Sequence, residues 1–403
     1  MGAKLDKIFD SANKNNLFKD KFVLQTNYTP ETIPHRDKEI EQIAAILAPC
    51  LKGDRTSNLF VYGKTGTGKT LSVHYVKNEL LKRAKSNGNG NFLQIEYLNC
   101  KLKKVADTEY RILAELIKKL GGEVPSTGLP TDQVYNRFID LIEKDKKLIV
   151  LILDEVDQAV KKISDNFLYN LTRLNSELSK TQISIIGISN DLRFLDNLDP
   201  RVRSSLSEEE IVFPPYNALQ LKDILKIRAD GAFNSGAISE GVIEKCAAFA
   251  AREHGDARRA LDLLRVAGEL AERQGDKKIK LKHIDMANNK IERDKILDVI
   301  ETEPKQFQLV LLAILNLSED NRISRIFTGD VYRIYQEFCK STGTEVLTQR
   351  RVSSVISEFD MLGLINANNI SRGTYGKTRE IKSQIPQEIV EQAKEILKNS
   401  LGL

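Results

Sequence analysis

Residues 63–70 have the spacing of a loop that binds phosphate groups. The segment reads Gly-Lys-Thr-Gly-Thr-Gly-Lys-Thr, which fits the pattern G-x-x-x-x-G-K-[ST]. Its glycines let the backbone approach an anion without a Cβ clash, and a helix that starts here presents free N–H groups and its positive dipole end. Lys69 would reach the β- and γ-phosphates of a nucleoside triphosphate, and the Thr70 hydroxyl would bind Mg²⁺.

The residues on either side of this loop fit the same interpretation. Residues 59–62 are apolar and predict a short buried strand, while Leu71, Val73, Val76 and Leu80 follow the loop at helical spacing. The alternative is a glycine-rich turn that only connects a strand to a helix. It is the weaker explanation, because every fixed position of the pattern is occupied.

Two carboxylates follow a continuous apolar run at residues 148–153. Residues 148–153 are all Leu, Ile or Val, which predicts a strand buried on both faces, and Asp154 and Glu155 come directly after it. Open α/β sheets bind ligands at the carboxyl ends of their strands. We therefore expect Asp154 to hold Mg²⁺ through water and Glu155 to orient an attacking water. A solvated acidic turn is the alternative.

Other polar side chains stand near later apolar runs. Residues 183–188 predict another buried strand, and Asn190 after it could touch a γ-phosphate or position water, although Asn often serves only the turn there. Arg201 and Arg203 could be solvated or could serve a neighbouring subunit's phosphate. Residues 28–37 contain two prolines and form an extended segment on which an adenine ring could rest, although ordinary packing also explains it.

Length and composition limit the possible classes. A chain of 403 residues is too long for one core, and a net charge of +5 permits nucleic-acid binding without arguing for it. The four cysteines lie far apart with no Cys-x-x-Cys pair, so we expect reduced thiols rather than zinc or disulfides. The sequence shows no apolar leader and no run of 18 apolar residues, so we expect neither a signal peptide nor a membrane span.

Pattern changes along the chain predict four regions. Residues 1–20 are polar and predict a flexible arm, residues 21–215 an α/β nucleotide-binding domain with a parallel sheet, residues 216–297 a helical lid and residues 298–403 a winged helix. The parallel sheet follows from the continuous apolar runs, and the lid from an almost uninterrupted helical pattern.

The winged-helix prediction rests on three helical patterns and a β-hairpin with strands near 364–365 and 379–381 around a turn at 368–377. Residues 301–403 contain 13 basic and 13 acidic side chains, and the basic ones concentrate on the third helix and the hairpin. Those elements read grooves in DNA-binding winged helices. A protein-binding winged helix is the alternative. The candidate DNA contacts are Gln349, Arg350, Arg351, Ser353, Ser354, Arg372, Tyr375, Lys377 and Arg379.

The whole chain resembles the archaeal DNA replication initiators of the origin recognition complex and cell division control type. These are AAA+ ATPases with a C-terminal winged helix. Residues 63–70 match their Walker A motif and residues 151–155 their Walker B motif. Asn190 matches sensor 1, and residues 255–258 match sensor 2, which includes Arg258.

The resemblance implies further site residues. The stretch 200–202 resembles the arginine-finger region, which gives that role to Arg201, with Arg203 as the competing choice. Residues 101–112 correspond to the insert of the initiator clade, whose polar face implies DNA contacts from Thr108, Tyr110 and Arg111. The implied nucleotide contacts are Tyr28, His35, Arg36, Gly63, Lys64, Thr65, Gly66, Thr67, Gly68, Lys69, Thr70, Leu71, Tyr216, Arg228 and Arg258.

The resemblance also implies a function. Such a protein binds ATP or ADP with Mg²⁺, recognises double-stranded origin DNA, and helps to recruit the replicative helicase beside other initiator paralogues. It is a slow, switch-like ATPase in the cytoplasm, associated with the nucleoid and not with a membrane. Three other classes share several motifs: a clamp-loader subunit, a transcription-regulating or signalling ATPase with a winged helix, and a branch-migration motor. The clamp-loader finger lies in a Ser-Arg-Cys motif, whereas residues 202–205 here read Val-Arg-Ser-Ser.

Overall fold

The computed structural model describes residues 17–88, 90, 92–101, 108–125, 128–206, 208–319, 324–371 and 377–403. It divides the chain into two units, one that ends at Ile284 and one that extends from Asp285 to Leu403. No helix in these described ranges is long and apolar enough to cross a bilayer.

A five-stranded parallel sheet forms the centre of the first unit, with the strand order β2-β3-β4-β1-β5. The strands are β1 (Asn58–Tyr62), β2 (Leu93–Asn99), β3 (Leu148–Asp154), β4 (Gln182–Ser189) and β5 (Glu208–Val212). The register places Asn99 beside Asp154 and Ser189 beside Tyr62. The last residues of β1, β2, β3 and β4 therefore meet along one edge of the sheet.

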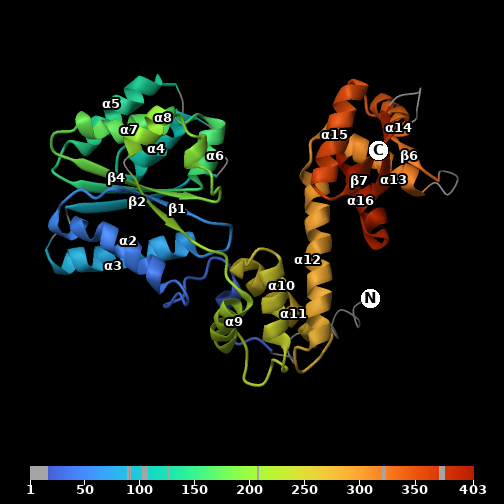
Figure 1. Ribbon diagram of the computed structural model, residues 1–403, viewed down its shortest axis with the longest axis horizontal. Helices are drawn as coiled ribbons and strands as arrows, with labels where there is room; N and C mark the ends of the chain where they lie inside the picture. The colour runs from blue at the N-terminus through green and yellow to red at the C-terminus, as the bar shows by residue number, and fades with distance from the viewer. Residues whose placement is uncertain are drawn as a thin grey trace, which may run out of the picture. The chain divides into compact units, whose positions relative to one another are not determined.

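Helices cover both faces of this sheet (Figure 1). All seven residues of β3 are buried, so the predicted two-sided burial is confirmed. Ile149, Leu151 and Leu153 pack on one side, and Leu148 and Val150 pack on the other. One face carries α2 (Asp37–Leu47) and α3 (Lys69–Ser86); the other carries α4 (Glu109–Lys119), α5 (Thr131–Ile142), α6 (Val156–Lys162), α7 (Asn166–Arg173) and α8 (Pro200–Leu206).

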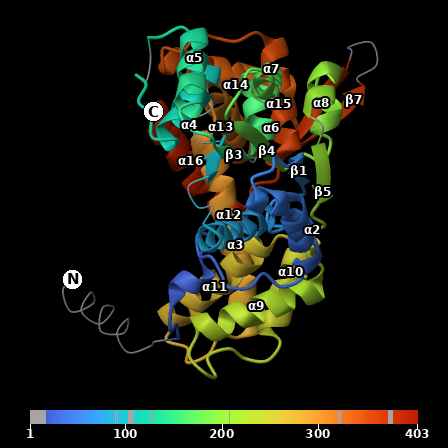
Figure 2. The same cartoon turned by 90° about the vertical axis from the view of Figure 1, so that its left-hand side faces the viewer.

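The lid consists of α9 (Ala218–Ala232), α10 (Val242–Arg252) and α11 (Ala257–Arg273), which lie side by side in Figure 1 and Figure 2. The chain before the sheet also packs on this lid. Leu17 and Phe18 are each only 5% exposed, and the Lys19 N–H donates to the Ala232 carbonyl over 2.8 Å. The predicted flexible arm is therefore wrong for residues 17–20, and residues 1–16 lie outside the described part of the chain.

The second unit is a winged helix, as predicted. It contains α13 (Lys305–Glu319), α14 (Thr328–Ser341), α15 (Gln349–Met361), α16 (Gln387–Leu401) and an antiparallel sheet of β6 (Ile326–Phe327), β8 (Lys377–Ser383) and β7 (Ile365–Ser371), in that order. The hairpin strands extend further than the sequence suggested, because cross-strand pairing continues out to Ser371 and Lys377. The predicted turn at 368–377 is therefore too long at both ends.

Several elements were not predicted from the sequence. Helices α5, α6, α7 and α16 and strand β6 have no counterpart among the expected elements. Helix α12 (Leu281–Thr302) is continuous through residues 297 and 298, so the expected lid boundary falls inside a helix and not in a linker. A helical pattern by itself carries no sign of where one core ends and the next begins.

Candidate nucleotide and DNA sites

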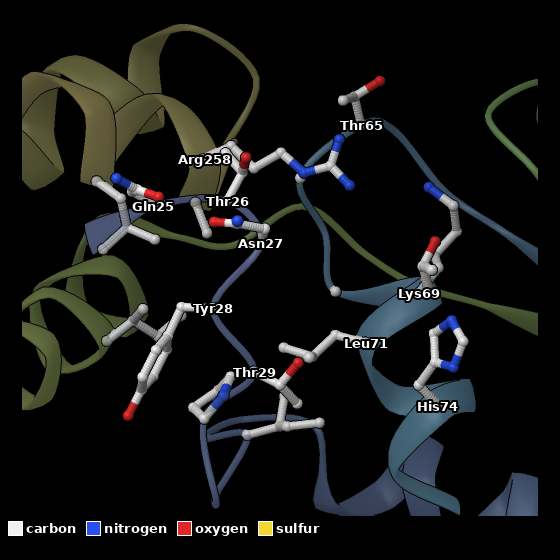
Figure 3. A pocket seen from close by; sticks show the side chains of 18 of the residues that line it. Gln25, Thr26, Asn27, Tyr28, Thr29, Thr65, Lys69, Leu71, His74 and Arg258 are labelled. Carbon is white, nitrogen blue, oxygen red and sulfur yellow. The ribbon is translucent and has the colours of Figure 1, made fainter. Parts of the chain in front are cut away.

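A pocket of about 460 Å³ lies at the carboxyl edge of the sheet, between the glycine-rich loop, residues 25–34 and the lid (Figure 3). Its volume is within the range of small-molecule sites. The structure brings together most of the predicted nucleotide contacts here. The predicted residues that line the pocket are Tyr28, Thr65, Gly66, Gly68, Lys69, Thr70, Leu71, Asp154, Glu155, Asn190, Tyr216, Arg228 and Arg258.

Two loop glycines allow close approaches that no other residue permits. Gly66 and Gly68 have φ values of 73° and 91°, in the left-handed region that favours glycine. A Cβ on Gly66 would lie 1.7 Å from the carboxylate of Asp256, and the Gly66 carbonyl accepts a bond from the Ala257 N–H at 3.2 Å. The start of α11 in the lid therefore rests directly on the phosphate loop. Figure 3 shows Arg258 reaching from this helix start toward Thr65.

Lys69 lies at the first turn of α3 and is 5% exposed. Its Nζ donates to the carbonyls of Gly63 and Lys64 at 2.7 and 2.8 Å and to Asn190 Oδ1 at 2.9 Å. Burial lowers the pKa of Lys69 to about 8, although Asp154 opposes this shift. Asn190, the predicted sensor 1 residue, and Lys69, the lysine predicted to bind phosphate, are thus in direct contact.

Thr70 and Asp154, the two residues expected to bind Mg²⁺, contact each other directly. The Thr70 hydroxyl donates to Asp154 Oδ2 at 2.9 Å, and the Glu155 N–H donates to Asp154 Oδ1 at 2.9 Å. No cluster of three or more metal-binding side chains occurs in the described ranges. A Mg²⁺ ion in this pocket would therefore depend on phosphate oxygens and water, which is how Mg²⁺ usually binds beside a nucleotide. The hydroxyl and carboxylate oxygens fit that group.

Glu155 has a φ of 53°, a left-handed conformation, and its carboxylate lies 3.6 Å from the Nζ of Lys101.

Asp157 is 2% exposed and accepts from the Ser189 hydroxyl at 3.1 Å and from the Asn190 N–H at 3.4 Å. Asp157 therefore holds the loop that carries Asn190. The sequence reading missed its role, since a carboxylate in the first turn of a helix is common.

Arg36, a predicted nucleotide contact, is not among the residues that line the pocket. Its guanidinium is 2% exposed and donates to the carbonyls of Thr67 and Pro214 at 2.8 and 2.6 Å. It also stacks 3.9 Å from the centroid of the Tyr216 ring. Arg36 therefore connects the glycine-rich loop at residues 63–70 to the segment between the sheet and the lid, from a position outside the pocket lining.

Four other predicted contacts also lie outside the pocket lining. His35 pairs with Asp223 at 3.0 Å, and Lys64 Nζ lies 3.4 Å from the His254 ring. The Thr67 hydroxyl donates to the Lys64 carbonyl at 2.9 Å. Gly63 allows close packing, because a Cβ there would lie 2.5 Å from the Phe213 carbonyl oxygen. The contacts described for these four residues are therefore with other parts of the protein.

Arg228 and Tyr28 face each other across the lid side of the pocket. The Arg228 guanidinium lies 4.3 Å from the centroid of the Tyr28 ring and donates to the Gln25 carbonyl at 3.3 Å. Arg228 is 7% exposed, and its Nε has no hydrogen-bond partner among the described residues. This pair joins α9 to the segment of residues 25–34, so a bound nucleotide would contact both at once.

In the second unit, a groove of about 920 Å³ separates the start of α15 from the hairpin. Its lining includes five of the predicted DNA contacts, Gln349, Arg350, Ser353, Ser354 and Arg379. Arg351 is exposed but does not line the groove. Arg372 and Tyr375 lie outside the described residues, as does the side chain of Lys377.

Arg379 is held within the fold, unlike the exposed Arg350. Its guanidinium donates to the Ser353 carbonyl at 3.2 Å, to the Ser357 hydroxyl and to Asn369 Oδ1 at 3.3 Å. Arg379 therefore joins α15 to the hairpin, which fixes the width of the groove between them.

Family models match three successive parts of the chain. An AAA domain matches residues 53–195, a Cdc6 AAA+ ATPase-type lid domain matches residues 222–289, and a CDC6 C-terminal winged helix domain matches residues 298–393. An ORC1-type DNA replication protein of Pyrococcus abyssi is 50% identical over 94% of this chain and 91% of its own length. The chain belongs to the ORC1-type DNA replication proteins.

Other members of the ORC1-type family agree with this assignment. The ORC1-type DNA replication protein 1 of Sulfurisphaera tokodaii is 47% identical over 97% of this chain and 96% of its own. The structure of the Aeropyrum pernix ORC1 protein in complex with DNA superposes with a TM-score of 0.82, at 43% identity over 95% of this chain and 97% of that one. The predicted family, the AAA+ ATPase class and the role in replication initiation are confirmed.

More distant structures show the fold alone. The Aeropyrum pernix ORC2 protein, in a structure of its ADPNP-ADP complexes, superposes with a TM-score of 0.58 at 20% identity.

The predicted arginine finger of this ORC1-type chain does not line its own pocket. Arg201 is 83% exposed and forms a two-pronged pair with Asp199 at 3.1 Å, while Arg203 is 49% exposed and pairs with Asp196 at 3.2 Å. Both side chains are accessible to another molecule, and the choice between them stays open.

The predicted contacts in the initiator insert have internal partners. Thr108 caps α4 by accepting from the Arg111 N–H at 3.3 Å, and the Tyr110 hydroxyl donates to the Pro125 carbonyl at 2.6 Å. Residues 102–107 lie outside the described part of the chain. The part of the insert that is described thus shows how α4 starts, and its proposed contact with DNA remains a prediction.

Among the residues that line the pocket but were not predicted are Tyr97 and Asn99 on β2, Lys101 just after it, and His74 on α3. Tyr97 donates its hydroxyl to Asp154 Oδ2 at 2.8 Å. Parallel strands end at the same edge of a sheet, so the pairing of β2 with β3 brings these side chains near Asp154. Without the strand order, the sequence does not show that β2 is the neighbour of β3.

Proposed function

We propose that this ORC1-type protein is an ATP-dependent switch that marks replication origins. The observation that carries the proposal is the contact between the lid and the phosphate loop, where Ala257 donates to the Gly66 carbonyl. A nucleotide in the pocket would touch the loop and Arg258 together, so its phosphates would bias the lid angle. Hinge closure of this kind is a common way for ligands to switch domain positions.

The residues of the pocket divide the work of binding and hydrolysis. Lys69 and Asn190 would hold the γ-phosphate, and Arg258 would meet it from the lid. Thr70 and Asp154 would bind Mg²⁺, which offsets phosphate charge during transfer. Glu155 would orient the attacking water once its carboxylate turns from Lys101.

We infer that the isolated chain hydrolyses ATP slowly and retains ADP. Arg201 and Arg203 are paired with aspartates and lie outside the lining of the pocket, so neither of these two would act as an arginine finger on the chain's own nucleotide. An arginine finger contributes roughly 10³–10⁵-fold to turnover in related phosphoryl-transfer enzymes. A neighbouring initiator subunit, a copy or a paralogue, would provide it.

We propose that the winged helix binds double-stranded origin DNA. The start of α15 would enter the major groove, and the hairpin β7–β8 would contact phosphates or the minor groove. The insert around Thr108 would add a second contact, which would allow one subunit to bend the DNA between the two. The support is the groove lined by Gln349 and Arg350 and the ORC1 relative whose structure contains DNA. Bound at an origin in the cytoplasm, on the nucleoid, the protein would help to recruit the replicative helicase.

DNase footprinting on genomic fragments at two salt concentrations tests the proposal. The test variant is Arg350→Ala/Arg351→Ala, which removes two exposed charges from the start of α15. The matched control is Lys305→Ala/Lys398→Ala, which removes two exposed charges from α13 and α16, outside the groove.

We expect a discrete footprint at an origin that the test variant loses and the control keeps. A footprint at promoters would instead support transcription control. Diffuse binding that weakens steeply with salt and is equal in all three proteins would mean that the protein contacts only the phosphate backbone of the DNA. Fast multiple-turnover ATPase activity without a partner would contradict the switch.

A further inference from the structure

Tyr97 lies in a position to control the carboxylate of Asp154. Tyr97 is on β2, two residues before Asn99, which pairs in register with Asp154 on β3. Its side chain therefore projects from the same face of the sheet as that carboxylate. The Tyr97 hydroxyl donates to Asp154 Oδ2 at 2.8 Å, and the Thr70 hydroxyl donates to the same oxygen at 2.9 Å.

Three donors thus contact the Asp154 carboxylate. Oδ2 accepts from Tyr97 and Thr70, and Oδ1 accepts from the Glu155 N–H at 2.9 Å. Two of these donors, the Thr70 hydroxyl and the Glu155 N–H, come from the two predicted motifs at residues 63–70 and 151–155. The third, the Tyr97 hydroxyl, comes from a strand outside both motifs.

Tyr97 is also held through its aromatic ring. Its ring packs on His74 with centroids 4.5 Å apart, and His74 lies on the same face of α3 as Thr70, one turn further on. Burial lowers the pKa of His74, so this ring adds no charge beside the carboxylate.

We propose that Tyr97 is a positioning residue for the magnesium–nucleotide complex, acting through Asp154. This inference rests on the proposed binding of Mg²⁺ and nucleotide. A carboxylate that meets a metal or its water works best when other hydrogen bonds fix its orientation, and loss of such a partner typically weakens metal affinity about 10- to 100-fold. Because Asp154 would hold Mg²⁺ through water, we place the effect at the low end of that range.

The test measures Mg²⁺ binding without hydrolysis. A fluorescent ADP analogue is titrated into wild type and Tyr97→Phe in EDTA, and Mg²⁺ is then titrated into each complex. The matched control is Tyr135→Phe, which also removes a buried hydroxyl that donates to a carboxylate, Glu109 at 2.7 Å, but outside the pocket lining.

For Tyr97→Phe we expect unchanged affinity for the analogue in EDTA and a half-saturating Mg²⁺ concentration that rises about tenfold. Tyr135→Phe should match the wild type. A second variant, His74→Ala, keeps the hydroxyl but removes the ring beneath it, and it should shift the Mg²⁺ curve in the same direction by less. In an Asp154→Asn background, Tyr97→Phe should cause no further shift.

Two results would overturn the inference: a Tyr97→Phe curve that coincides with the wild type, or an equal shift in both tyrosine variants. If the wild type failed to bind the analogue at all, the proposed nucleotide function would fail as well. If it bound the analogue with no response to Mg²⁺, only the metal role of Thr70, Asp154 and Tyr97 would fall. Melting curves of the variants identify any that lose the fold.

Discussion

The nucleotide pocket and the winged-helix groove are both lined by polar side chains, but they are built differently. In the pocket, Lys69 and Asp154 are each 5% exposed and have hydrogen-bond partners from several elements. In the groove, Arg350 and Ser354 are exposed on one helix. The pocket is therefore largely arranged before a ligand arrives, whereas the groove presents side chains that a ligand must order.

This difference determines how much conformational freedom the side chains lose when a ligand binds. A preorganised site costs little to bind, because its side chains lose little further freedom, whereas each exposed rotamer-rich side chain costs about 0.5–1.5 kcal/mol to order. Arg36 and Arg350 show the contrast within one residue type. One guanidinium is enclosed by carbonyls and a ring, and the other extends from the first turn of α15.

The largest expected effect is on stability and distinguishes the buried Arg36 from the exposed Arg351. Arg36→Ala would leave the carbonyls of Thr67 and Pro214 without their buried donor and open a cavity beside Tyr216. We expect it to lower the free energy of unfolding by about 3 kcal/mol, the scale for losing buried hydrogen bonds to a charged group. Urea denaturation measures this change.

Arg351→Ala provides the matched measurement, since that exposed side chain should change stability by less than about 0.5 kcal/mol. Arg36→Lys should recover only part of the loss, because an ammonium group cannot reproduce the planar fork that reaches two carbonyls. Equal stability of Arg36→Ala and Arg351→Ala would remove the distinction between the two regions.

The same contrast explains how far the sequence could predict the sites. Most of the residues assigned from motifs line the pocket, because a fixed spacing and the ends of buried strands determine where such residues lie; they are Thr65, Gly66, Gly68, Lys69, Thr70, Asp154, Glu155 and Asn190. Arg36 and His35 were assigned to the nucleotide on resemblance alone. No feature of the sequence shows that Arg36 points to Thr67 and Pro214, since those contacts join segments far apart in the chain.

In the winged helix, the sequence predicted the elements better than the roles. The third of the predicted helices is α15, which begins after its cap Thr348 and carries Arg350 in its first turn. The internal role of Arg379 was not predictable, because it depends on cross-strand pairing that brings Arg379 beside Asn369, and on packing of the hairpin against Ser353. Net charge gave no help, as the region is neutral.

The next expected effect concerns pH and tests the buried environment of Lys69. Because burial lowers its pKa to about 8, the free site loses this cation as pH rises through 8. A bound phosphate favours the protonated amine, so binding then takes up a proton. Affinity for a fluorescent ADP analogue without Mg²⁺ should fall about tenfold per unit above pH 8, and should show no such slope below pH 7.

Lys69→Arg is the control for this pH dependence. A guanidinium stays charged over the whole interval, so the variant should bind more weakly but with a flat profile from pH 7.5 to 9.5. A wild-type profile that is equally flat would show that Lys69 keeps its charge in the free site, and that the pocket is less enclosed than its geometry indicates.

The smallest expected effect separates two arginines within the groove. Arg350→Ala should weaken binding to the footprinted sequence about fivefold, which corresponds to about 1 kcal/mol. If Arg350 contacts a phosphate, the variant should also reduce the steepness of the plot of log affinity against log salt concentration by about one. Arg379→Ala should weaken binding less and leave the slope unchanged, because its donors already serve Ser353, Ser357 and Asn369. Its loss should instead loosen the hairpin, which amide hydrogen exchange in β7 and β8 detects. If Arg379→Ala changed the salt slope as much as Arg350→Ala, then Arg379 would leave its internal partners when DNA binds, and the groove would be as adaptable as its exposed side chains.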